Sequence, residues 1–192
     1  VSFILIVGIA VAVNPNFFKW RNITNIFVQS SVIGVIALGM TMVICAGQID
    51  ISVGAQVAII SGFGIEVLNV THSVLLTLLF CMAFGTVIGT FNGLLIAKGH
   101  MPAMIATLAV QTSCRAIINH FGQGGPFTVA NGISTEPFYE SFRQVANGSI
   151  YIFGQKIPYP MLMFIAMALV FGVIMQRTKL GKHIYAVGSN AV

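Results

Sequence analysis

The residues best suited to binding chemistry lie in one polar segment between two long apolar runs. The segment from Gly47 to Gly54 reads Gly-Gln-Ile-Asp-Ile-Ser-Val-Gly. Its amide, carboxylate and hydroxyl side chains supply both donors and acceptors of hydrogen bonds. One hypothesis is therefore that Gln48, Asp50 and Ser52 line a path for a polar solute.

The alternative for Asp50 is a structural role as the N-cap of the apolar run that follows it. Aspartate is among the best N-cap residues, because its carboxylate accepts hydrogen bonds from free amides and suits the positive end of a helix. We favour the cap over direct contact with a solute, and the two roles are compatible.

Motifs of enzymes and metal proteins do not occur in the sequence. It has no GxxxxGK[ST] loop, no HExxH pair and no GxSxG elbow. Cys45, Cys81 and Cys114 have no metal-binding spacing, and the four histidines are scattered near expected helix ends. We therefore expect no catalytic residue and no metal, and an enzyme within the membrane has little support.

The composition points to lipid as the main solvent. Hydrophobic residues make up 57% of the chain and charged residues only 7%, against roughly a quarter in soluble domains. Between Arg21 and Lys98 the only charged residues are Asp50 and Glu66. The basic residues that give the net charge of +5 lie in short connections, which favours a topological role and argues against a nucleic-acid partner.

These features predict an all-α fold, namely a polytopic transmembrane helix bundle with about six spans. An aspartate at a helix centre costs about 2.5 to 3.5 kcal/mol on insertion scales, so we expect a broken or tightly turned helix near Asp50, with partners for the carboxylate. A span needs about 20 mainly apolar residues. The candidates are Val28 to Gly47, Val53 to Val70, Val74 to Ala97, Tyr159 to Met175, Pro102 to Asn119 and a remnant at Val1 to Val13.

The long polar interval from Phe121 to Pro158 is expected outside the membrane. Within it we expect a short helix that Ser134 or Thr135 caps, and then a hairpin that turns at Gly154. Basic residues after the spans, such as Lys98 and Arg177, place those ends in the cytoplasm and the long loop outside. We expect residues 1–192 to form one transmembrane domain, a fragment whose N-terminal start is missing.

Small residues recur on the fourth of these spans. Gly85, Gly89 and Gly93 are spaced by four and fall on one face, where another helix backbone can approach closely. We interpret the stripe as a helix-packing surface. Asn92 beside it can add a hydrogen bond between helices, worth about 0.6 to 2 kcal/mol.

Three stretches, in this order, resemble the ribose-type permeases of bacterial ABC sugar importers, which belong to the branched binding-protein-dependent transport permeases. They are Gly39 to Ile44 leading into Ile49 to Gly54, then Asn92 to Ile96 followed by Pro102 and Ile105 to Leu108, and finally Thr178 to Asn190. The departures are Gln48, Ile51 and Ala103, where the family usually has glycine, leucine and a second proline or similar residue. They leave the substrate open.

The resemblance implies a permease subunit in the bacterial cytoplasmic (inner) membrane that carries a monosaccharide, ribose or a related sugar. It also implies that residues 1–192 are one permease domain, a fragment without its C-terminal half. It implies four kinds of partner: a second permease subunit in a homodimer, separate cytoplasmic ATP-binding subunits, an extracytoplasmic sugar-binding protein and the lipid bilayer. ATP would be bound by the partner subunits, so this chain needs no cofactor.

Site roles follow from the resemblance combined with the residue patterns. The substrate-path candidates are Gln48, Asp50, Ser52 and Asn92. Candidates for docking the binding protein are Glu136, Glu140 and Arg143, although a merely solvated helix face is an equal alternative. The expected ATPase-proximal cytoplasmic segment contains Lys179, Gly181, Lys182, Gly188 and Asn190.

Two other classes of protein stay open. An ion-coupled secondary transporter or channel for a small polar solute would also have a broken span near the midplane. It would need ionisable residues inside the membrane, and only Asp50 qualifies clearly. A membrane scaffold would not need the polar break at all.

Overall fold

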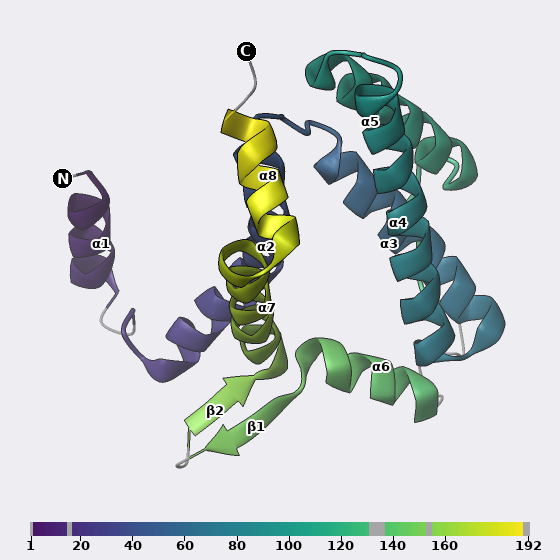
Figure 1. Cartoon of the computed structure of the whole chain (residues 1–192). Helices are drawn as coiled ribbons and strands as arrows, with labels where there is room; N and C mark the ends of the chain where they lie inside the picture. Colours follow the sequence, from purple (N-terminus) through teal and green to yellow (C-terminus); the bar gives the residue numbers. More distant parts are fainter. Residues whose placement is uncertain (1, 15–16, 131–136, 153–154, 190–192) are drawn as a thin grey trace.

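The computed structural model describes residues 2–14, 17–130, 137–152 and 155–189, which are mostly helical (Figure 1). The elements in chain order are α1 (Ser2–Val13), α2 (Trp20–Cys45), α3 (Val53–Thr71), α4 (Val74–Ala97), α5 (Ala103–Phe121), α6 (Pro137–Asn147), β1 (Ser149–Ile152), β2 (Gln155–Pro158), α7 (Tyr159–Arg177) and α8 (Lys179–Ser189). The predicted polytopic helix bundle is confirmed.

Four of the helices are long and apolar enough to cross a membrane, namely α2, α3, α4 and α7. The fifth and sixth expected spans also form helices, but α1 has 12 residues and α5 carries polar residues such as Gln111 and Arg115. α2 begins at Trp20, well before the expected Val28, because the helix continues through polar residues beyond the apolar run.

The break near Asp50 separates α2 from α3. At the end of α2, the amide of Gly47 bonds the carbonyl of Ile44 at 2.9 Å and the amide of Gln48 bonds that of Val43 at 3.1 Å. This pair of hydrogen bonds is a Schellman motif. It requires the left-handed backbone that Gly47 adopts, with φ 75°. Residues 46–52, which we call the linker, then lead to α3.

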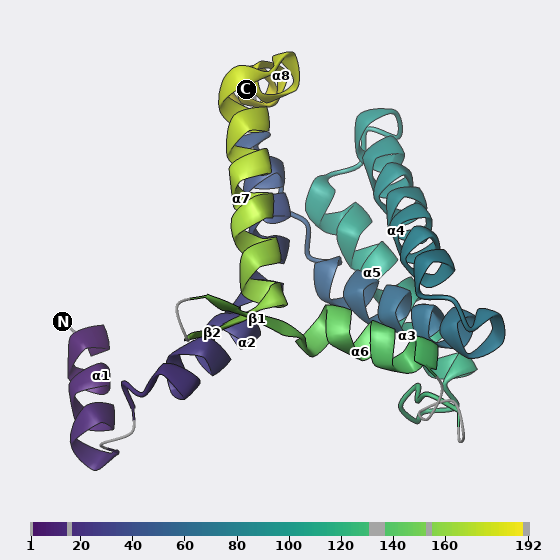
Figure 2. The same ribbon diagram turned by 90° about the horizontal axis from the view of Figure 1, so that it is seen from below.

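The helices pack in two groups on either side of this linker (Figures 1 and 2). α2 packs on α7, with α8 and the β-hairpin at opposite ends of the pair, while α3 packs on α4 and α5. Ala55, Ile59, Val110 and Cys114 form a buried cluster in the second group. Outward faces are apolar, as a lipid-facing surface requires, with Met82 70% exposed.

The two ends of the molecule differ in the elements they carry. α8 and the connection between α4 and α5 lie at one end, and the β-hairpin lies at the other (Figure 1). The hairpin is antiparallel, and the indole Nε1 of Trp20 donates to the carbonyl of Lys156 at 3.0 Å. The helix expected in the polar interval is α6, whereas its capping residues and the turn at Gly154 lie outside the described residues.

Close packing of α2 on α7 predicts a stability effect at Gly34. A Cβ on Gly34 would lie 2.5 Å from the ring of Phe164, whereas a Cβ on Gly39 of the same helix meets no atom within 4 Å. We expect Gly34→Ala to be about 1 to 3 kcal/mol less stable than Gly39→Ala in unfolding measurements in bicelles. Both changes add the same helix propensity, so equal stabilities would contradict this packing.

Candidate functional site

One serine hydroxyl joins the linker to two helices. Ser52 is fully buried, and its Oγ donates to Asp50 Oδ1 while it accepts from Gln56 Nε2 at 2.6 Å and from Asn92 Nδ2 at 3.0 Å. A hydroxyl has one donor and two acceptor positions, so these bonds use its whole capacity. Ser52 therefore ties the linker to α3 and α4 and keeps no bond for a solute.

The expected N-cap role of Asp50 is wrong. α3 begins at Val53, and its N-cap residue is Ser52, whose side chain makes no capping bond. Asp50 Oδ1 instead accepts the backbone N–H of Ser52 at 2.8 Å, as in an Asx turn. The carboxylate lies too far upstream to cap the first turn of α3, so it orders the linker and not the helix.

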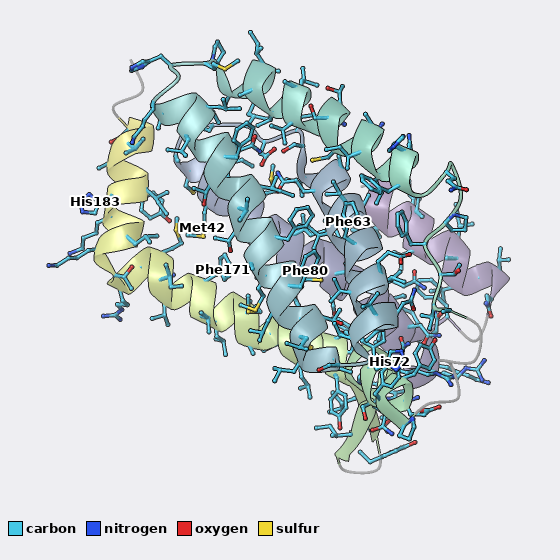
Figure 3. All side chains as sticks on the ribbon, turned by 90° about the vertical axis from the view of Figure 1, so that its right-hand side faces the viewer. Met42, Phe63, His72, Phe80, Phe171 and His183 are labelled. Carbon is cyan, nitrogen blue, oxygen red and sulfur yellow. The ribbon has the colours of Figure 1, made fainter. Side chains whose placement is uncertain are left out.

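A cavity of about 400 Å³ lies where the two helix groups meet. Its lining comes from the ends of α2, α4 and α5 and from the linker, and Met42 of α2 lies between α8 and α4 in Figure 3. Lining residues are Met42, Val43, Ala46, Gln48, Ile49, Asp50, Gly89, Asn92, Gly93, Ile96 and Thr107. Three of the four substrate-path candidates thus face one cavity, and the fourth, Ser52, holds two of them.

Two of the lining side chains have hydrogen-bonding capacity to spare. Asn92 is 5% exposed, and its Oδ1 is buried without a partner among the described residues. Gln48 is half-exposed, and its side-chain amide makes no hydrogen bond within the described part of the chain. The cavity therefore offers an acceptor, an amide and one carboxylate in otherwise apolar surroundings.

The glycine stripe on α4 has two different environments. A Cβ on Gly85 would lie 3.2 Å from Ile60 Cδ1, so that glycine faces α3. Gly89 and Gly93 meet no atom within 4 Å and line the cavity instead. In the described chain, the close helix approach expected along the stripe therefore occurs at Gly85, while the other two glycines leave room beside Asn92.

The remaining candidates lie away from this cavity. Glu140 and Arg143 form an exposed ion pair of 3.6 Å on α6, with side chains 57% and 64% exposed, while Glu136 lies outside the described residues. On α8, Lys179 and Lys182 are exposed. Gly181 and Gly188 lie directly against backbone carbonyls, and Asn190 lies outside the described residues.

Two residues of the candidate site were not predicted from the sequence. Gln56 bonds Ser52 Oγ and reaches Asp50 Oδ2 at 3.4 Å. Its spacing of four residues from Ser52 on a helix was a usable signal. Thr107 lines the cavity from α5, but its hydroxyl bonds the carbonyl of Ala103 in its own helix, and nothing in the sequence indicates that it lies near Asn92.

Comparison with known proteins places the chain in a family. Residues 22–192 match the family model described as the permease component of the branched-chain amino acid transport system. The chain belongs to this family. With the four long apolar helices, membership makes the permease chain a multi-pass protein of the bacterial inner membrane.

Individual relatives of the permease chain are named for sugars. It is 33% identical to the ribose import permease protein RbsC of Haemophilus influenzae over 99% of its length, which covers 56% of that protein. It is 37% identical to RbsC of Bacillus subtilis, over 98% of this chain and 55% of that protein. It is 31% identical to the L-arabinose ABC transporter permease protein AraH of Azospirillum brasilense, over 92% of this chain and 48% of that protein.

The chain spans about half the length of the curated relatives it matches. No solved structure matches it significantly.

The saturated hydroxyl of Ser52 leads to a prediction about stability. Ser52→Ala removes the partner of three polar groups, so it should cost about 1 to 3 kcal/mol relative to Ser61→Ala. Ser61 is the matched control, because its exposed hydroxyl bonds only carbonyls of its own helix α3. Unfolding free energies measured in bicelles test this, and equal losses for the two variants would contradict the network.

Proposed function

We propose that this chain forms the solute path of a permease subunit that carries a monosaccharide, ribose or a related sugar, into the bacterial cell. Relatives named for ribose and L-arabinose support a sugar, whereas the family description names branched-chain amino acids. The permease itself would break no bond, and ATP hydrolysis on separate subunits would drive the transport.

The cavity between the two helix groups is the observation that carries this proposal. Gln48, Asp50 and Asn92 approach it from two sides of an apolar space. Sugar hydroxyls both donate and accept hydrogen bonds, so an amide, a carboxylate and an unpaired carbonyl oxygen complement them. Small binding sites typically combine a mostly apolar lining with a few such polar groups.

We assign the proposed partners to the two ends of the molecule. α8 carries exposed Lys179 and Lys182 at the end of α7 and would face the cytoplasmic ATP-binding subunits. α6 and the β-hairpin lie at the other end, where an extracytoplasmic sugar-binding protein would dock. A second copy of the permease would complete the pathway by pairing in the membrane.

The first experiment measures sugar uptake in vesicles that contain the full-length permease with its ATP-binding subunit and its binding protein. ATP-dependent ribose accumulation that survives collapse of ion gradients would support the proposal. Uptake that needs a gradient and no ATP would favour the ion-coupled transporter instead. Competition by leucine but not by ribose would move the substrate to the branched-chain amino acids.

Removing the negative charge at the cavity should slow transport strongly. We expect Asp50→Asn and Asp50→Leu to lower ATP-driven sugar uptake by about tenfold or more, a loss of about 1.4 kcal/mol of transition-state stabilisation. Glu66→Gln is the control, because Glu66 is exposed on α3 and does not line the cavity. Full uptake by Asp50→Leu, in a protein that inserts normally, would contradict the assignment of Asp50 to the path.

The charges of α6 should matter for docking of the binding protein. We expect Glu140→Gln combined with Arg143→Gln to slow association of the sugar-loaded binding protein and to weaken its salt dependence, because exposed charges mainly tune encounter rates. Surface plasmon resonance on the reconstituted complex measures both rate constants. If association is unchanged even when Glu136→Gln is added, the three residues have no docking role.

A further inference from the structure

The end of α8 touches the end of α2 through a glycine. A Cβ built on Gly188 would overlap the carbonyl oxygen of Cys45 and would lie 3.0 Å and 3.3 Å from the carbonyl carbons of Cys45 and Ala46. All of these are backbone atoms, so they cannot swing aside as a side chain can. Only glycine permits this approach, and Cys45 is the last residue of α2 before the linker.

α8 is itself fixed on α7. Thr178 Oγ1 donates to the carbonyl of Ile174 at 2.7 Å and accepts the backbone N–H of Gly181 at 3.4 Å. A Cβ on Gly181 would overlap the carbonyl oxygen of Met175, so the turn between the two helices is as tight as a glycine allows. A displacement of α8 therefore reaches Cys45 directly.

The other end of the linker belongs to the second helix group. Ser52 is bonded to Asn92 of α4 at 3.0 Å. The linker is thus held at its start by α8 and at its end by α4, and Gln48 and Asp50 lie between these two contacts. Because both face the cavity, a shift of either contact changes where their polar atoms lie relative to Asn92.

We propose that Gly188 is a positioning residue of the solute path: through Cys45 it sets the place of the linker, so that α8 controls the arrangement of Gln48 and Asp50 opposite Asn92. Gly181, Ile184 and Gly188 are the less exposed residues of α8, while Lys179, Lys182 and His183 are exposed. A cytoplasmic subunit that pushes on the exposed face would move the linker through Gly188. The proposal rests on the proposed function, because a positioning role in transport requires that the cavity be the solute path.

The test compares Gly188→Ala with Gly172→Ala in the full-length permease assembled with its ATP-binding subunit and binding protein. Gly172 of α7 is the matched control, because a Cβ there meets no atom within 4 Å. We expect Gly188→Ala to keep ATP hydrolysis while sugar uptake per ATP falls about fivefold or more. A normal uptake-to-ATP ratio in Gly188→Ala would overturn the proposal.

A second measurement needs no sugar and no variant at Gly188. In a chain with Cys81→Ala and Cys114→Ala, maleimide labels Cys45 beside the contact. The labelling rate should change about fivefold or more when a non-hydrolysable ATP analogue is added to the complex. The same rate in both states would overturn the proposal. A changed rate in a complex that moves no sugar would uphold the contact's role and reject the proposed function.

Discussion

A polar break between two membrane helices must satisfy its own hydrogen bonds, because lipid offers none. The hydroxyl of Ser52 meets this constraint by bonding Asp50, Gln56 and Asn92 at once. The Schellman turn at Gly47 meets it on the other side by pairing the last carbonyls of α2. The linker can therefore leave helical geometry with hydrogen-bonded groups at both of its ends, and the separation of the helices into two groups depends on it.

The same bonds also place the polar groups of the cavity. α4 contributes Asn92 between two glycines that leave open space, and the linker contributes Gln48 and Asp50. The remaining lining is aliphatic or small. Such a cavity at the junction of two helix groups changes shape whenever the groups move, which is what a transport path driven from the cytoplasm requires.

Much of this architecture was predictable from hydrophobic runs, because a span of about 20 apolar residues has few alternatives to a helix. α5 was harder to predict as a membrane span, since polar residues such as Arg115 interrupt its apolar face. The motif residues of the linker were also found, but the capping role given to Asp50 was wrong. Its carboxylate accepts the backbone amide of Ser52, which precedes α3, and the side chains of Ser52 and Gln56. The contact of Gly188 with Cys45 joins residues far apart in the chain, and no local pattern in the sequence reveals it.

The central claim, that solute passes the cavity beside the linker, is tested most directly by a single cysteine in place of Gln48. In a chain whose three native cysteines are replaced by alanine, a water-soluble thiol reagent should label Gln48→Cys, and ribose undergoing ATP-driven transport should slow that labelling. A cysteine at Leu79, which is 53% exposed on the apolar surface of α4, serves as the control and should stay unlabelled. If Gln48→Cys is inaccessible to the reagent, or if transported sugar leaves its labelling unchanged, the cavity is not the path.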